Sequence, residues 1–187
     1  MVNARLTIKQ MQEVFQNSPI FELNTRRIAL RRQLRKNPED PTLIKSLQST
    51  LRDKVVRLAA ADGVVITYSA YDELFASDLD NDLLENGVRS IMGVYDRSKS
   101  ELMQAAVRAT MDQTNVLVLI ISESSMRDPN VIATYEYFWN AGKVIVPIMF
   151  ELCNVDHLLL GMSPLDFYDQ WQSGLRRLHH LLGAKKI

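Results

Sequence analysis

The chain has 187 residues, 47% of them hydrophobic, which is enough to bury the core of one domain and leaves room for an extension. Its formal net charge is zero, but residues 1–60 hold 12 Lys and Arg against 5 Asp and Glu (+7), whereas residues 61–187 hold 10 against 17 (−7). The single cysteine, Cys153, excludes an internal disulfide, no Cys/His spacing resembles a metal site, and no apolar run is long enough to span a bilayer. Because the first residues also lack the apolar stretch of a signal peptide, we expect a cytoplasmic protein.

Residues 1–60 are predicted to form a helical hairpin. In the segment 42–60, apolar residues recur every three or four positions and so lie on one face of a helix. These residues are Leu43, Leu47, Leu51, Val55 and Leu58. Asp40 or Thr42 is available as the N-cap of this helix, and Pro41 suits the same junction.

The segment 20–37 is predicted as the preceding helix, joined to the next one by the turn "NPEDP". We expect Asn24 to cap its start and Leu23 to pack on Ile28. The helix carries a basic ridge with a spacing of four residues. The ridge consists of Arg27, Arg31 and Arg35.

The basic ridge has two interpretations. A row of cations can follow nucleic-acid phosphates, but the segment has no interleaved aromatic residues and no known DNA-binding motif, so nucleic acid is not the expected partner. The alternative is a solvated helix face or a contact with an acidic partner surface. The +7/−7 division favours attraction between the hairpin and the acidic domain of the same or a sister copy, and an anionic partner for the hairpin remains the other hypothesis.

Beyond residue 61, short β-branched runs alternate with amphipathic helical segments. The expected strands are 63–69, 88–94, 115–122, 143–150 and 163–168, and the expected helices are 71–87, 98–114, 129–141, 154–161 and 170–183. The most apolar strand, 115–122, is predicted to be central. Five βα units of this kind predict an α/β fold with a five-stranded, flavodoxin-like parallel sheet and helices on both faces.

In such a sheet, ligands bind beyond the carboxyl ends of the strands, so the loops after the strands are the candidate site. "TYSAYDE" after the first strand has no glycine, which argues against a dinucleotide-binding Rossmann turn and against a phosphate-binding P-loop. The third strand ends in "IISESS", with Ser122 where a phospho-receiver domain would need an aspartate.

Four stretches resemble the Toll/interleukin-1 receptor (TIR) domains of bacterial type. They are "VVITYSAYDELFASDLDNDLLENGVR", "QTNVLVLIISESSM", "EYFWNAGKVIVPIMFE" and "LLLGMSPLDF". The resemblance covers residues 62–183, about two thirds of the chain, and keeps the order and spacing of the family's segments. It implies a TIR-like domain at 61–187, which follows the helical hairpin predicted at 1–60 from the apolar periodicity.

The family contains NAD-cleaving enzymes as well as interaction modules. In the enzymes, a glutamate on the third helix lies four residues after a tryptophan; its carboxylate holds the ribose hydroxyls of NAD and stabilises the positive charge that develops as nicotinamide leaves. The resemblance places Asn130 at the tryptophan and Thr134 at the glutamate. A threonine hydroxyl can bond a ribose but carries no negative charge, and the loss of such an electrostatic term lowers the rate by orders of magnitude.

Two other acids are candidates for the missing carboxylate. Glu136 is two residues beyond Thr134, which turns its side chain by about 200° on a helix, so a solvated helix-face charge is its favoured reading. Glu123, at the carboxyl end of the central strand, is better placed. Asp128 is instead expected to cap the third helix before Pro129.

Other candidate ligand-binding residues follow the first two strands. They are Thr67, Tyr68, Ser69 and Asp72 after the first strand, and Asp96 and Arg97 after the second. In the family, the second of these loops closes over the ligand, but here it is short and lacks the usual Pro-Gly pair. The simpler readings are that Tyr68 packs and that Asp72 supports the first turn of its helix. The histidines show no catalytic pattern, and we expect His179 and His180 to be exposed.

Three functional hypotheses follow. The first is a TIR-like signalling module that associates with itself or with another TIR-like protein and at most binds a nucleotide. The second is an NAD glycohydrolase that uses Glu123 or Glu136, with NAD as substrate and no separate cofactor. The third, more remote, is a nucleoside-deoxyribosyltransferase-like enzyme, which shares the sheet topology.

Overall fold

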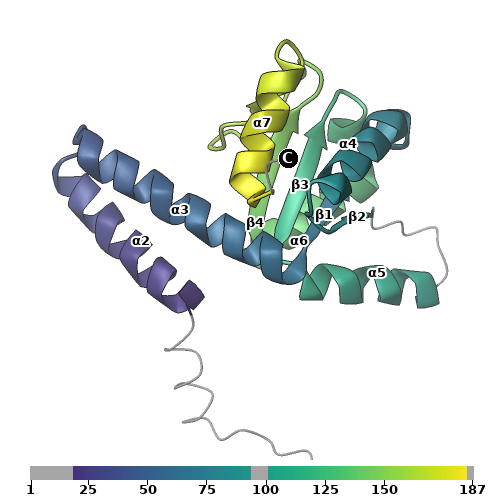
Figure 1. Cartoon of the computed structure of the whole chain (residues 1–187). Coiled ribbons are helices and arrows are strands. Elements are labelled where there is room, and N and C mark those ends of the chain that lie inside the picture. The colour runs from purple at the N-terminus through teal and green to yellow at the C-terminus, as the bar shows by residue number, and fades with distance from the viewer. Residues whose placement is uncertain (1–18, 94–100, 185–187) are drawn as a thin grey trace, which may run out of the picture. The chain divides into compact units, whose positions relative to one another are not determined.

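The structure is a computed structural model that describes residues 19–93 and 101–184. The chain forms two compact units, Met1–Arg57 and Leu58–Ile187. Figure 1 shows the elements of each unit, and the two are described separately below.

The N-terminal unit contains helix α2 (Pro19–Lys36) and most of helix α3 (Pro41–Asp62), whose residues from Leu58 onward belong to the second unit. The turn between them was predicted correctly, and Asp40 caps α3, because its Oδ1 accepts hydrogen bonds from the backbone N–H groups of Thr42 (2.8 Å) and Leu43 (3.3 Å). On α3, the predicted stripe is partly buried: Val55 is buried and Leu43, Leu47 and Leu51 are half-buried.

The predicted N-cap of α2 was wrong. The helix begins at Pro19, which suits a first helical position because proline lacks an N–H, so Asn24 lies inside the helix and cannot be its N-cap. The side chains of the expected contact between Leu23 and Ile28 lie outside the described residues.

The second unit is built on a five-stranded, all-parallel sheet with the order β2-β1-β3-β4-β5. The strands are β1 (Val64–Thr67), β2 (Ser90–Met92), β3 (Val116–Ile121), β4 (Val144–Met149) and β5 (Leu165–Asp166). Every residue of β3 is buried, which confirms its predicted central position. The strand order is the flavodoxin-like one, and its direction reverses between β1 and β3.

Helices cover both faces of this sheet. They are α4 (Glu73–Glu85), α5 (Glu101–Gln113), α6 (Pro129–Asn140) and α7 (Trp171–Leu182), with short 3-10 turns at η1 (Ala70–Asp72) and η2 (Ser125–Arg127). On one face, α4 and α7 share a cluster of aromatic rings, in which Phe75 contacts Phe150 (4.2 Å between centroids) and Trp171 (5.3 Å). On the other face, α5 and α6 bury Met111, Tyr135 and Phe138 against β3.

Two sequence signals fix the ends of these helices. Gly87, with a φ of 79°, follows α4 and donates its N–H to Leu84 O, so the predicted glycine stop is confirmed. Asp128 caps α6 as predicted: its Oδ1 accepts from the N–H of Asn130 at 2.9 Å, and Pro129 occupies the first turn.

The predicted helix at 154–161 was wrong. This connection between β4 and β5 consists of turns, in which Asp156 Oδ1 accepts a hydrogen bond from the N–H of Leu158 at 2.8 Å. Asp side chains that bond nearby backbone groups compete with helix formation. The apolar run serves instead to bury Leu159 in the core shared with α5 and α6.

Candidate functional site

The candidate site lies at the carboxyl ends of β1 and β3, where the strand order reverses. Parallel strands end at the same edge of the sheet, so the loop after β1 meets the loop after β3. The contact between the loops is a direct hydrogen bond: Ser122 Oγ donates to Asp72 Oδ2 at 2.6 Å. Both side chains are buried, with 0% of Ser122 and 4% of Asp72 exposed.

Ser122 is the centre of a small buried network. Its Oγ also accepts from the N–H of Ser125 at 2.9 Å, while its own N–H donates to Ser125 Oγ at 2.8 Å. Ser125 Oγ in turn donates to Ser122 O at 3.1 Å. These bonds fold the sequence "SESS" into a closed turn at the end of β3 and fix the Ser122 hydroxyl where it meets Asp72.

Asp72 is an anchor beneath the surface rather than an open ligand. Burial raises the pKa of its carboxyl group, and the nearby Glu151 raises it further. Hydrogen bonds from Ser122 and from the backbone of Ser69 lower the pKa and partly offset the effect of burial. The carboxyl group therefore ties η1 to the end of β3, as a buried acid with two hydrogen bonds.

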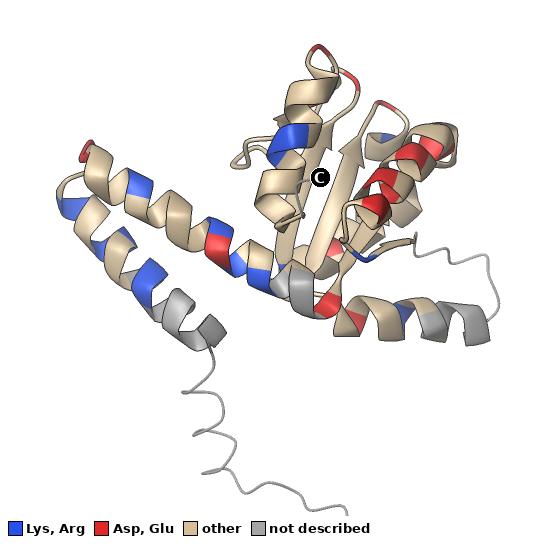
Figure 2. Ribbon diagram, in the orientation of Figure 1, with Lys and Arg blue, Asp and Glu red and all other residues tan. Residues whose placement is uncertain are grey.

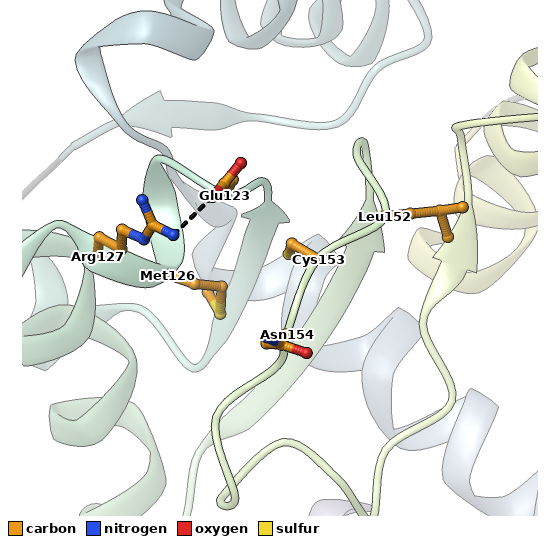
Figure 3. A pocket seen from close by; sticks show the side chains of 6 residues that line it. All are labelled: Glu123, Met126, Arg127, Leu152, Cys153 and Asn154. Atoms are coloured by element: carbon orange, nitrogen blue, oxygen red, sulfur yellow. Dashed lines mark hydrogen bonds and ion pairs between the residues drawn. The ribbon is translucent and has the colours of Figure 1, made fainter.

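Two open pockets lie above this network and share Glu123 and Arg127. The first, of about 640 Å³, is drawn in Figure 3 and is lined by Glu123, Met126, Arg127, Leu152, Cys153 and Asn154. The second, of about 680 Å³, is lined by Ser69, Tyr71, Glu123, Ser124, Arg127, Asp128, Pro129 and Glu151. Both volumes fall in the range of small-molecule sites.

Glu123 stands between the pockets in an ion pair. Arg127 Nη2 lies 2.6 Å from Glu123 Oε1, one helical turn further along the chain, and both side chains are largely exposed. The backbone N–H of Glu123 donates to Glu151 Oε2 at 3.1 Å, which links the ends of β3 and β4. Exposed pairs of this kind add little stability, about 0–1 kcal/mol, so the pair remains adaptable.

Thr134, at the position of the family's glutamate, is fully buried in α6. Its hydroxyl donates to the carbonyl oxygen of Asn130 at 2.8 Å, one turn back in the same helix. Thr134 lines neither of the two pockets, and Asn130 also is not among their lining residues.

Glu136 lies on another face of α6. It is exposed and lines a third pocket, of about 510 Å³, together with residues of α5 such as Arg108 and Asp112. Glu136 therefore lines a different pocket from Glu123, and neither Glu136 nor Thr134 lines the two pockets at the ends of β1 and β3.

The other candidates are distributed differently. Thr67 is buried, and its hydroxyl has no hydrogen-bond partner among the described residues, while Ser69 reaches the second pocket and also caps η1. Tyr68 is half-buried, and burial, followed by the charges of Glu73 and Asp80, raises the pKa of its phenol. Asp96 and Arg97 lie outside the described residues.

Sequence reasoning missed three partners in this region. The sequence indicated for Ser122 only that the domain is not a phospho-receiver, and it did not indicate a role for Arg127 or Glu151. The closely spaced serines of "SESS" are a signal for hydroxyl-to-backbone turns, but the contact of Ser122 with Asp72 joins residues 50 positions apart and has no local signal.

Two further side chains, His179 and Cys153, are half-buried in the structure. His179 was expected to be exposed, but it is half-buried and its Nε2 contacts Asp82 Oδ2, which joins α7 to α4. Cys153 is a half-buried thiol whose pKa is raised by burial and then by the neighbouring acids, Glu151 first.

In the described parts of the chain, no three His, Cys, Asp or Glu side chains are grouped to hold a metal ion. No helix in those parts is long and apolar enough to cross a membrane.

Comparison with known proteins agrees with this fold. A sequence model described as "TIR domain" matches residues 64–179. The crystal structure of the TIR domain of the Toll-related receptor TRR-2 from Hydra magnipapillata superimposes with a TM-score of 0.54 at 19% identity, and the match covers 64% of this chain and 97% of that one. Among curated proteins, none matches significantly. Since the family model spans more than half of the sequence, this chain belongs to the TIR-domain family.

Proposed function

We propose that this protein is a TIR signalling module that acts in the cytoplasm by associating with itself or with another TIR protein, and that its pockets at most bind a nucleotide such as NAD. The observation that supports this proposal is the state of the carboxyl groups around the two pockets. Each of them already takes part in a contact within the protein.

The carboxyl groups are used as follows. Asp72 is buried against Ser122, Asp128 caps α6, and Glu151 accepts from the backbone of Glu123. Glu123 itself is paired with Arg127. A carboxylate that stabilises an oxocarbenium-like centre must present its charge to the substrate, and an adjacent guanidinium competes with the substrate for that charge. Thr134, buried and uncharged, supplies none.

A second candidate function has one observation in its favour. Glu123 is exposed, lies at the carboxyl end of the central strand and borders both pockets. If a ligand displaced Arg127, the freed carboxylate would face it. An NAD glycohydrolase that uses Glu123 is therefore the alternative, and Glu136 is disfavoured because it lines a different pocket.

One experiment separates the two functions. The purified protein is incubated with NAD at low and at high protein concentration, nicotinamide release is followed by chromatography, and the molar mass is measured by light scattering under the same conditions. We expect concentration-dependent association with no more than marginal nicotinamide release. Glu136→Gln is the matched control for Glu123→Gln. Rapid release that Glu123→Gln abolishes and Glu136→Gln preserves would replace this proposal with the enzymatic one.

A further inference from the structure

The outer side of α4 exposes large apolar side chains next to acids. Tyr71, just before the helix, is 90% exposed, Leu74 is 85% exposed and Leu84 is 49% exposed. We call this surface the α4 outer face; it consists of Tyr71, Glu73, Leu74, Asp78, Leu84 and Glu85, all of which are exposed. The opposite side of the helix buries Ala76, Leu79 and Leu83, so the exposed leucines are not needed for the core.

The charge of α4 defines the kind of partner that this face fits. The helix contains five acids (Glu73, Asp78, Asp80, Asp82 and Glu85) and no Lys or Arg, which gives a charge of −5. Figure 2 shows these acids gathered along α4. A largely exposed pair of apolar side chains flanked by like charges favours a partner that is amphipathic and cationic.

A helix of that kind is present in the same chain. The sequence of α2 contains six Lys or Arg residues and one acid, Glu22, which gives +5, and Figure 2 shows cations along it. The basic ridge runs along its side, with Arg31 and Arg35 exposed and Arg27 half-buried. Leu34, half-buried, adds apolar surface next to the ridge.

The described part of the hairpin holds two cations close together in a partly buried place. Arg27 Nε is buried without a hydrogen-bond partner among the described residues. Lys54 of α3 lies close enough that Arg27 lowers its pKa, in addition to the larger lowering by burial. Two cations that repel each other in a partly buried place are stabilised by an anion supplied from outside the hairpin.

The two surfaces also agree in dimension. At 1.5 Å per residue, Arg27 and Arg35 are about 12 Å apart along α2, and Asp78 and Glu85 are about 10 Å apart along α4. Antiparallel or parallel alignment of the helices therefore brings two cations of the ridge within reach of two exposed acids. The same alignment leaves Leu74 and Leu84 against the apolar stems of the arginines.

We propose that the α4 outer face of one copy binds the basic ridge on α2 of a second copy. This inference rests on the proposed self-associating function and names its contact. Because the two surfaces differ, the contact is heterologous: each copy offers one ridge and one face, so association continues from copy to copy into a ring or an open chain.

Charge exchange in the full-length protein tests the proposal. One variant carries Arg31→Glu and Arg35→Glu, and another carries Asp78→Lys and Glu85→Lys. All four positions are exposed, so each variant is expected to keep the wild-type circular dichroism spectrum and melting temperature. Association, measured by light scattering across protein and salt concentration, should weaken by about tenfold or more in each variant alone.

Mixing the two variants should restore association, because the reversed ridge of one variant then meets the reversed α4 outer face of the other, and the unchanged α2 meets the unchanged α4. Glu136→Lys with Asp169→Lys is the matched control: it makes the same charge change at exposed acids outside α4 and should leave association unchanged. Leu74→Ala should weaken association without altering its dependence on salt, since it removes apolar area and no charge.

The contrary outcomes are distinct. If both charge variants associate as well as the wild type does, this contact is overturned and self-association is left intact. If reversal on α4 weakens association but reversal on α2 does not, α4 meets something other than the ridge, such as a second α4, and the proposal is wrong. A wild type that stays monomeric at low salt and high concentration overturns this inference and the self-association part of the proposed function, and leaves association with another TIR protein as the part still standing.

Discussion

Ser122→Ala tests whether the junction of the β1 and β3 loops is the anchor of the site. The substitution removes the 2.6 Å hydrogen bond to Asp72 and the acceptor for the N–H of Ser125 at 2.9 Å. A hydrogen bond to a charged group contributes about 1.5–3 kcal/mol, and a buried N–H left without an acceptor costs about 1–3 kcal/mol. Because Ser122 and Ser125 are fully buried, water does not replace the lost partners. We expect a loss of roughly 3–5 kcal/mol in the free energy of unfolding, measured by urea denaturation.

Ser124→Ala is the control for this prediction. Ser124 belongs to the same loop and is half-buried, but its side chain makes no capping hydrogen bond, so its loss should change stability by less than about 0.5 kcal/mol. If Ser122→Ala costs less than about 1 kcal/mol, or no more than the control, the buried network does not hold the two loops together.

The dependence on pH gives a second reading of the same contact. Burial raises the pKa of Asp72 in the folded state above its ordinary value near 3.9, so the folded protein binds the proton more tightly than the unfolded chain does. The stability that this group contributes is fully present below that ordinary value and is lost as pH rises through the folded-state pKa. Ser122→Ala removes a bond that favours the ionised form, so its deficit should grow from pH 4 to pH 7, whereas Asp72→Asn should abolish this part of the pH dependence. A deficit of equal size at every pH would contradict the assignment.

Two further substitutions test the packing around the site. Gly174→Ala places a Cβ 2.4 Å from the carbonyl oxygen of Asp166, so we expect a net loss of about 2 kcal/mol in thermal melting despite the higher helix propensity of alanine, whereas Gly161→Ala, with open space around it, should be nearly neutral. Thr134→Glu buries a charge without a partner, so it should destabilise the protein by more than about 3 kcal/mol and create no NAD cleavage. The control, Thr134→Val, should stay within about 1 kcal/mol of the wild type. A stable, NAD-cleaving Thr134→Glu protein would show that this side chain can reach a pocket.

The sequence was informative wherever a local pattern determines a local structure. The apolar, β-branched run at 116–121 predicts a buried central strand because only a strand covered on both faces has no polar side. Asp40 and Asp128 were identified as caps because their carboxylates can satisfy N–H groups two or three residues ahead. The same kind of reasoning mistook Asn24 for a cap, since a good capping residue is also tolerated inside a helix when the residues before it continue the turn.

The candidate site was less predictable because it depends on contacts between distant segments. Asp72 and Ser122 meet only because β1 and β3 are neighbours, which the polar residues themselves do not encode. The burial of Thr134 is equally a property of the fold: the period of α6 places it on the same face as the buried Val131 and Phe138, and that face packs on the sheet. A resemblance aligned residue by residue identified the position but not the direction of its side chain.

The placement of charges links these observations to function. Around the pockets, acids and their partners are close together and largely satisfied: Glu123 by Arg127, and Asp72 by Ser122. On α2 and α4, charges of one sign predominate along each helix: α2 has six Lys or Arg against the single acid Glu22, and α4 has five acids and no Lys or Arg. Satisfied groups hold a structure in place, whereas separated charges of opposite sign attract over a Debye length of about 8 Å at physiological ionic strength and guide the approach of another molecule. The distribution of charge in this chain therefore favours a protein whose recognition takes place on its helices, with the sheet edge as the framework that positions them.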